Sequence, residues 1–172
     1  MKTIRFGLST DEIQRAINEV KEFKAEFQKK VDTYRKRITE EIAAQASANF
    51  GSAVVDDVIN GSPRKANVTV TFSDKGGIGV VVADGEDAVW CEFGAGVYHN
   101  GSAGSSPNPY GNDLGFTIGS YGKGYGAKRA WGYYDEDGNL VITRGTPASM
   151  PMYNAAQEVM RKAVEIAREV FK

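Results

Sequence analysis

The stretch that decides the fold is residues 9–49, which read STDEIQRAINEVKEFKAEFQKKVDTYRKRITEEIAAQASAN. Apolar side chains recur here at steps of three or four residues, namely Ile13, Ile17, Val20, Phe23, Phe27, Val31, Tyr34, Ile38, Ile42 and Ala46. That spacing places them on one face of an α-helix, and no proline or glycine interrupts it before Gly51. The sequence therefore predicts one continuous helix that Gly51 ends in a left-handed cap.

The start of this helix carries a capping signal. Ser9 can accept a hydrogen bond from the backbone N–H of Glu12, and the Glu12 side chain can reach back to the N–H of Ser9. About forty residues form a rod of ~60 Å, whereas a domain of this length has a radius of gyration of about 15–16 Å. Part of the helix must overhang the domain, bend around it or pack on another copy. We favour one long helix with part of its stripe used between subunits; the alternative is two helices joined by a bend.

A hairpin is predicted after this helix. Residues 67–72 alternate between apolar and polar side chains, and residues 78–83 return as a second strand after a turn at 73–77. The alternation places three apolar side chains on one face: Val68, Val70 and Phe72. Residues 52–59, between the helix and the hairpin, fit a short helix or an irregular bridge.

Further elements follow the hairpin. Residues 88–93 fit either a third strand or one helical turn. A second hairpin is predicted at 130–134 and 140–144, around the turn signal Asp137-Gly138. These strands suggest a small antiparallel sheet.

The chain ends with a second helical pattern. Ser149 can cap this helix, and Pro151 in its first turn costs little because its missing N–H has no partner there anyway. We expect an α+β fold with a long N-terminal helix and a C-terminal helix covering one face of the sheet. The chain forms a single domain, 1–172, interrupted by a Gly- and Tyr-rich insertion at 97–129.

Composition excludes several classes of protein. The 172 residues carry a net charge of -1, which implies no general attraction to nucleic acid or acidic membranes. Cys91 is the single cysteine, so an internal disulfide is excluded and a reducing compartment is compatible. The N-terminus lacks the apolar run of a signal peptide, and the longest apolar run, 78–83, is too short to span a bilayer. We expect a soluble protein made in the cytoplasm.

Catalytic chemistry finds little support. Cys91 and the single histidine, His99, could be read as the nucleophile and base of a hydrolase. Cys91, however, lies beside Trp90 and Phe93, where a thiol is usually an inert packing group. One His and one Cys cannot build a common zinc site, and residues 135–139 lack a complete calcium-loop pattern. We expect no catalytic residue, no metal and no cofactor.

A nucleic-acid-binding patch is the stronger alternative. The insertion and the strand after it combine cationic and aromatic side chains suited to stacking on single strands: Tyr121, Lys123, Tyr125, Lys128, Arg129 and Trp131. The balanced overall charge argues against nucleic-acid binding as the main role.

Two short motifs give the chain a resemblance. Residues 89–96, VWCEFGAG, resemble the "hydrophobic-x-E-F-G-T/A-G" element of the HK-ninety-seven gene-ten-like family of phage tail components. Residues 146–152, TPASMPM, resemble the family's proline-containing lead into the C-terminal helix. The order of parts agrees in outline over the whole chain, while the long insertion departs from shorter members of the family.

The resemblance implies a structural virion protein of the head–tail neck and not an enzyme. Such proteins work as rings, often of six copies, that contact the head connector and the tail tube. The resemblance assigns structural roles to five residues: Glu92, Phe93, Gly94, Pro147 and Pro151. Phe93 is expected to anchor in the core, Gly94 to permit a sharp exit, and Glu92 to cap or pair at that bend. The insertion is expected to order only in the assembled neck.

Overall fold

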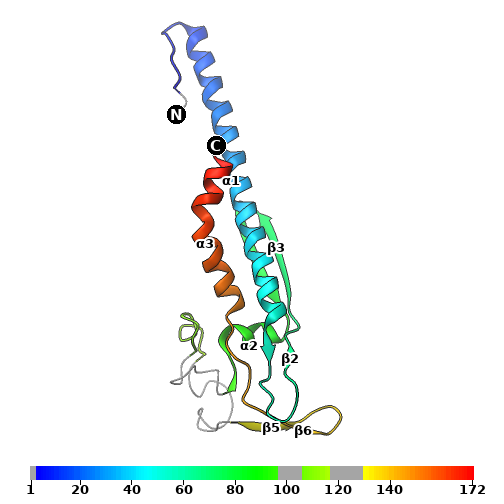
Figure 1. The fold of residues 1–172 in the computed structure, drawn as a ribbon. Helices are drawn as coiled ribbons and strands as arrows, with labels where there is room; N and C mark the ends of the chain where they lie inside the picture. Colours follow the sequence, from blue (N-terminus) through cyan, green and yellow to red (C-terminus); the bar gives the residue numbers. More distant parts are fainter. Residues whose placement is uncertain (1–2, 97–105, 117–129) are drawn as a thin grey trace.

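The computed structural model describes residues 3–96, 106–116 and 130–172, which form an α+β fold (Figure 1). The helices are α1 (Thr10–Ser52), α2 (Asp87–Phe93) and α3 (Pro151–Val170). The strands are β1 (Val54–Val55), β2 (Arg64–Lys65), β3 (Thr69–Lys75), β4 (Ile78–Asp84), β5 (Trp131–Tyr134) and β6 (Leu140–Thr143). The predicted fold class is therefore confirmed.

The long helix α1 runs without a break for 43 residues, which confirms one rod and excludes the two-helix alternative. At its start the Ser9 hydroxyl oxygen accepts from the Glu12 N–H at 3.4 Å and donates to Glu12 Oε2 at 2.6 Å. The predicted stop was wrong, because Gly51 lies inside the helix. The chain leaves through Ala53 with φ -69° and ψ 139°, an extended conformation that needs no left-handed glycine.

Helix α3 packs antiparallel along α1 (Figure 1). At the start of α3, Asn49 Nδ2 donates to the carbonyl of Pro151 at 3.0 Å. At its end, the ring of Phe171 lies 5.6 Å from Phe27, centroid to centroid, and Lys30 Nζ donates to the Lys172 carbonyl at 2.6 Å. The N-terminal part of α1 extends beyond this end, so the expected overhang is present.

The hairpin β3–β4 packs on a different side of α1. Arg35 of α1 donates to both carboxylate oxygens of Asp74, at 2.9 and 3.1 Å. The strands extend through residues 73–75, so the predicted five-residue turn was too long and only Gly76 and Gly77 turn the chain. Their φ angles of 61° and 84° fit the left-handed geometry of a two-residue hairpin turn.

The strands form three separate two-stranded antiparallel sheets in the described parts of the chain. The expectation that both helices cover one sheet face was therefore wrong: α1 covers β3–β4, and α3 covers α1. Ser52 is the last residue of α1, and residues 53–59 contain no helix; they form β1, paired with β2, and a bridge from Val58 to Thr143. The second hairpin, β5–β6, is confirmed.

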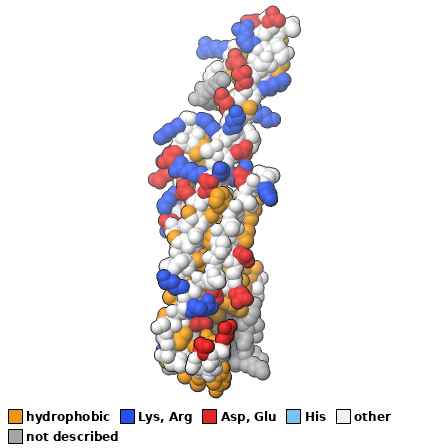
Figure 2. All heavy atoms as spheres, turned by 90° about the vertical axis from the view of Figure 1, so that its right-hand side faces the viewer, with side chains coloured by type: hydrophobic (Ala, Val, Ile, Leu, Met, Phe, Trp, Pro, Cys, Tyr) orange, Lys and Arg blue, Asp and Glu red, His pale blue; other side chains and the backbone are white. Residues whose placement is uncertain are grey.

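The main core lies where the end of α1 meets β1 and α2. Its buried members are Phe50, Ala53, Val55, Ala88 and Cys91. Residues 88–93, for which strand and helix were both open, belong to α2. Figure 2 shows the face with the hairpin, where hydrophobic side chains gather at mid-height and charges of both signs cover the overhanging part.

Helix α2 is fixed to β2 by a buried carboxylate. Both Asp87 oxygens accept from the guanidinium of Arg64, at 2.7 and 2.8 Å, and one also accepts from the Asn67 N–H at 2.9 Å. The bond from Arg64 holds the pKa of Asp87 below its usual range, although burial opposes that shift. The orientation of α2 therefore depends on an ionised side chain.

The close approach of the hairpin to α1 generates a first prediction. A β-carbon on Gly79 would overlap the hydroxyl of Thr39, so Gly79→Ala should lower the free energy of unfolding by about 1–3 kcal/mol. Urea denaturation measures this change. Adding Thr39→Ala should recover part of the loss. Gly51→Ala, with no atom within 4 Å of the added carbon, should be neutral or stabilising; an equal loss there would contradict the clash.

The Asp87 contacts generate a second prediction. Asp87→Asn should destabilise the protein by about 1–3 kcal/mol at pH 7. Because the folded-state pKa of Asp87 is lowered, its contribution is complete above about pH 4 and is lost as the pH falls through the folded value. Wild type and variant should therefore converge in acid denaturation profiles, whereas exposed Asp84→Asn should change little at any pH. A gap that stays constant down to pH 2 would refute this assignment.

Candidate structural site at the start of the last helix

The two motif segments, residues 92–96 and 146–152, lie against each other. The N–H of Ala95 donates to the carbonyl of Thr146 at 2.8 Å, and the N–H of Met150 donates to the carbonyl of Cys91 at 3.1 Å. About fifty residues of chain separate the segments, so this contact is tertiary. It sets the position and direction in which α3 begins.

Glu92 is the centre of this contact. Its side chain is buried, with 9% of the residue exposed. Oε2 accepts from the N–H of Met152 at 2.9 Å, and Oε1 accepts from the N–H of Tyr153 at 3.0 Å. These N–H groups belong to the first turn of α3 and have no partner within the helix. The carboxylate also lies at the positive end of the helix dipole.

Two opposing effects act on the protonation of Glu92. Burial raises the pKa of its carboxyl, and the N–H groups of Met152 and Tyr153 oppose that shift by binding the ionised form. The side-chain amide of Asn108 supplies a third donor, 2.8 Å from Oε1. With three N–H donors on two oxygens, the carboxylate replaces much of the hydration that it loses on burial.

The expected cap from Ser149 was wrong. Met150 occupies the N-cap position in a left-handed conformation, φ 51° and ψ 53°, and provides no side-chain cap. The Ser149 hydroxyl instead donates to the Cys91 carbonyl at 3.4 Å. The capping group comes from α2, and a local pattern in the sequence before α3 could not reveal it.

The other motif residues have identifiable positions. Pro151 is the first residue of α3 and is buried, as its missing N–H allows. Pro147 is half-buried, and its carbonyl accepts from the N–H of Ser149 at 2.9 Å. Gly94 has φ 81° and ψ 161°, a conformation restricted largely to glycine, and it turns the chain away from α2.

Phe93 is half-buried and does not belong to the main core, so its expected anchoring there was wrong. Its ring stacks on the ring of Phe116, with centroids 4.2 Å apart and planes inclined by 9°. The hydroxyl of Ser106 donates to the Phe93 carbonyl at 2.8 Å. Phe93 therefore joins α2 to the 106–116 segment.

Part of the predicted insertion is thus ordered on the isolated chain. Asn108 is 3% exposed and Phe116 is 7% exposed, so residues 106–116 form a packed part of the fold. Sequence reasoning missed both residues because glycine, serine and proline surround them. The remaining parts of the insertion, 97–105 and 117–129, lie outside the described residues.

The residues considered for catalysis do not form a described site. The Cys91 thiol is fully buried, and burial raises its pKa to about 11, so it stays protonated at neutral pH. His99, Lys123, Lys128 and Arg129 lie outside the described residues, as do Tyr121 and Tyr125. Within 3–96, 106–116 and 130–172, no group of three or more His, Cys, Asp or Glu side chains could hold a metal ion.

Two further searches bear on the class of protein. None of the helices in the described parts combines the length and apolar character needed to cross a membrane. Comparisons with protein-family models, with curated proteins and with solved structures return no match to this chain. What the geometry defines is a structural junction in which a buried carboxylate orients the last helix.

The junction generates a third prediction. Glu92→Ala leaves three N–H groups without their acceptor and should lower the free energy of unfolding by about 2–3 kcal/mol. Ser149→Ala, at the cap position expected from the local sequence, should cost less than about 0.5 kcal/mol. Thermal and urea denaturation compare the two variants. Equal losses, or a larger loss for the serine variant, would contradict capping by Glu92.

Proposed function

We propose that this protein is a structural subunit of the head–tail neck of a tailed phage or prophage. In this proposal it assembles as a ring, often of six copies, contacts the head connector and the tail tube, and resides in the virion after synthesis in the bacterial cytoplasm. Its proposed role is structural, not enzymatic, and it needs no cofactor.

One observation carries the proposal. The two segments that resemble the phage tail-component family, 89–96 and 146–152, are joined through the carboxylate of Glu92 and the first turn of α3. A shared structural task explains why both motifs occur in one chain. Glu92, Gly94 and Pro151 all serve to define how α3 begins.

The overall shape is also compatible with a ring subunit. The N-terminal part of α1 overhangs the rest of the fold (Figure 1). Its exposed apolar side chains form a surface that a neighbouring copy can cover. Heterologous contacts between identical copies form a closed ring when the rotation between them closes.

Co-assembly tests the function. The chain is produced together with a phage head connector protein and a tail tube protein, and the purified complexes are imaged by electron microscopy. We expect a ring at the junction of connector and tube. Glu92→Ala should reduce ring incorporation, while Ser149→Ala and Cys91→Ser should incorporate like the wild type.

Two outcomes would refute the proposal. The first is a chain that never joins the connector or the tube but binds single-stranded nucleic acid with strong salt dependence, since phosphate contacts release counterions. The second is a hydrolytic activity that Cys91→Ser abolishes.

A further inference from the structure

An exposed apolar stripe runs along residues 10–30 of α1, most of which overhang the end of α3. Its large members are 39–53% exposed: Ile13, Ile17, Val20, Phe23 and Phe27. Five large apolar side chains in a row on one helix face form a contiguous exposed apolar patch, and such a patch is typical of an interaction surface. Two of them, Phe23 and Phe27, already stack on each other with ring centroids 6.3 Å apart.

The stripe continues the interface between α1 and α3. The ring of Phe171 lies 5.6 Å from Phe27 and 6.2 Å from Tyr34, and α3 ends at Val170. Toward the N-terminus of α1, the same face continues through Val20 to Ile13 without a second helix among the described residues. The surface therefore has the character of a helix–helix interface whose second helix is missing.

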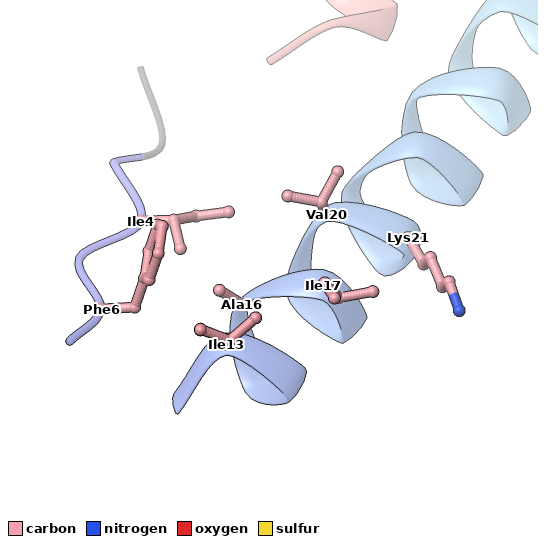
Figure 3. A pocket seen from close by; sticks show the side chains of 7 residues that line it. All are labelled: Ile4, Phe6, Ile13, Ala16, Ile17, Val20 and Lys21. Atoms are coloured by element: carbon pink, nitrogen blue, oxygen red, sulfur yellow. The ribbon is translucent and has the colours of Figure 1, made fainter. Parts of the chain in front are cut away.

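An open apolar hollow of about 340 Å³ lies at the far end of the stripe. Figure 3 shows Ile4 and Phe6 of the N-terminal segment on one side and the stripe on the other. Apart from Lys21, whose amine points away from the hollow, the lining is apolar: Ile4, Phe6, Ile13, Ala16, Ile17 and Val20. Packed interiors leave few voids of this size, so apolar side chains from outside can enter here.

The charged residues beside the stripe indicate which partner covers it. Ile13, Val20 and Phe27 are spaced by seven residues and define the first position of a heptad, with Ala16 and Phe23 at the fourth. One margin of the stripe then carries three acidic side chains, also spaced by seven: Glu12, Glu19 and Glu26. The other margin carries Lys24. The equivalent position one heptad earlier is apolar, Ile17, so one margin carries three acidic side chains and the other a single basic one.

This pattern is complementary to itself in one orientation. In a parallel pair of helices, the last position of each heptad lies opposite the fifth position of the next heptad in the partner. Glu19 of one copy therefore lies opposite Lys24 of the second copy. In an antiparallel pair, the acidic margins face each other and repel. A parallel arrangement also suits neighbours in a ring, because rotation about the ring axis keeps an axially aligned helix parallel to its neighbour.

We infer that residues 10–30 of α1 pack in parallel on the same segment of a second copy, with the stripe as the seam and Glu19 of one copy opposite Lys24 of the next. This inference rests on the proposed function, because it names one contact between copies in the ring. The contact is isologous, so the ring also needs a heterologous contact to close. The pairing buries the stripe and fills the apolar hollow.

Substitutions on the two sides of α1 test the seam. The wild-type chain should show a mass that rises with concentration in light scattering. Val20→Asp places a charge in the seam and should weaken association at least about tenfold. Ala25→Asp adds the same charge to an exposed position on the opposite side and should leave the mass unchanged. Equal behaviour of all three chains, or a wild type that is monomeric up to about 1 mM, would overturn the pairing.

Cysteine cross-linking tests the orientation in the full chain. Ile13→Cys should form a disulfide between two copies under mild oxidation, since Ile13 lies near one end of the segment and meets its equivalent in a second copy only in a parallel pair in register. Ala25→Cys should not, and native Cys91 is buried and does not compete. Cross-links between Ile13→Cys and Phe27→Cys chains, but not within either chain type, would show antiparallel packing and overturn the inference.

Charge reversal tests the inferred contact between Glu19 of one copy and Lys24 of the other. Glu19→Lys and Lys24→Glu should each weaken self-association, because each sets like charges opposite each other. Mixing the two variants should restore association as a heterotypic pair. Failure of the mixture to recover would contradict the proposed contact.

The two proposals fail in different ways. A Val20→Asp chain that enters the phage neck as well as the wild type overturns the pairing and leaves the proposed function intact. A parallel pair that forms in solution but never occurs between connector and tail tube supports the pairing and refutes the function.

Discussion

The carboxylate of Glu92 binds the first free N–H groups of α3 and thereby joins three segments that are distant in the chain. These segments are α2, the start of α3 and residues 106–116, which Asn108 attaches to the same oxygen as Tyr153. Charge–dipole attraction and hydrogen bonding act together at this site, and both are strengthened by burial. Because α3 begins at this carboxylate, its direction along α1 depends on the contact.

The position of α3 in turn determines how much of α1 is covered. α3 has 20 residues and α1 has 43. Because α3 starts beside the C-terminal end of α1 and runs antiparallel to it, the N-terminal end of α1 stays uncovered. Phe171 marks the limit of the covered part through its contacts with Phe27 and Tyr34. The hairpin also packs on α1, through the contact between Arg35 and Asp74, but it lies on a different side of the helix and does not cover the stripe. The exposed stripe is a direct result of this difference in length.

Much of the fold could be predicted from periodicity. The apolar spacing of residues 9–49 predicted α1 with its Ser9 cap, and alternation predicted both hairpins. These signals are local, since each depends on neighbouring side chains along one helix or strand. Where local signals competed, prediction failed: Gly51 resembled a helix stop, but extended Ala53 ended the helix two residues later.

The junction could be predicted only in part. The resemblance pointed to Glu92 as a capping or pairing residue, and the structure places it on the N–H groups of Met152 and Tyr153. Ser149 was preferred as the cap because it has the right chemistry at the right local position, yet an acid 57 residues earlier in the chain takes that role. Asn108 and Phe116 gave no signal, because their burial follows from tertiary contacts with Glu92 and Phe93. Capping from a distance leaves no fixed spacing in the sequence.

The unbroken rod of α1 also has a mechanical consequence. Its overhanging part, about twenty residues, is ~30 Å long and has no proline or glycine at which to bend. It is fixed at its base by ion pairs on two sides, Arg35 with Asp74 and Arg37 with Glu169. A tilt of ~10° at this base would move the tip by about 5 Å. The rod therefore acts as a lever arm. A small shift of the hairpin or of α3 would displace the tip and any molecule bound there.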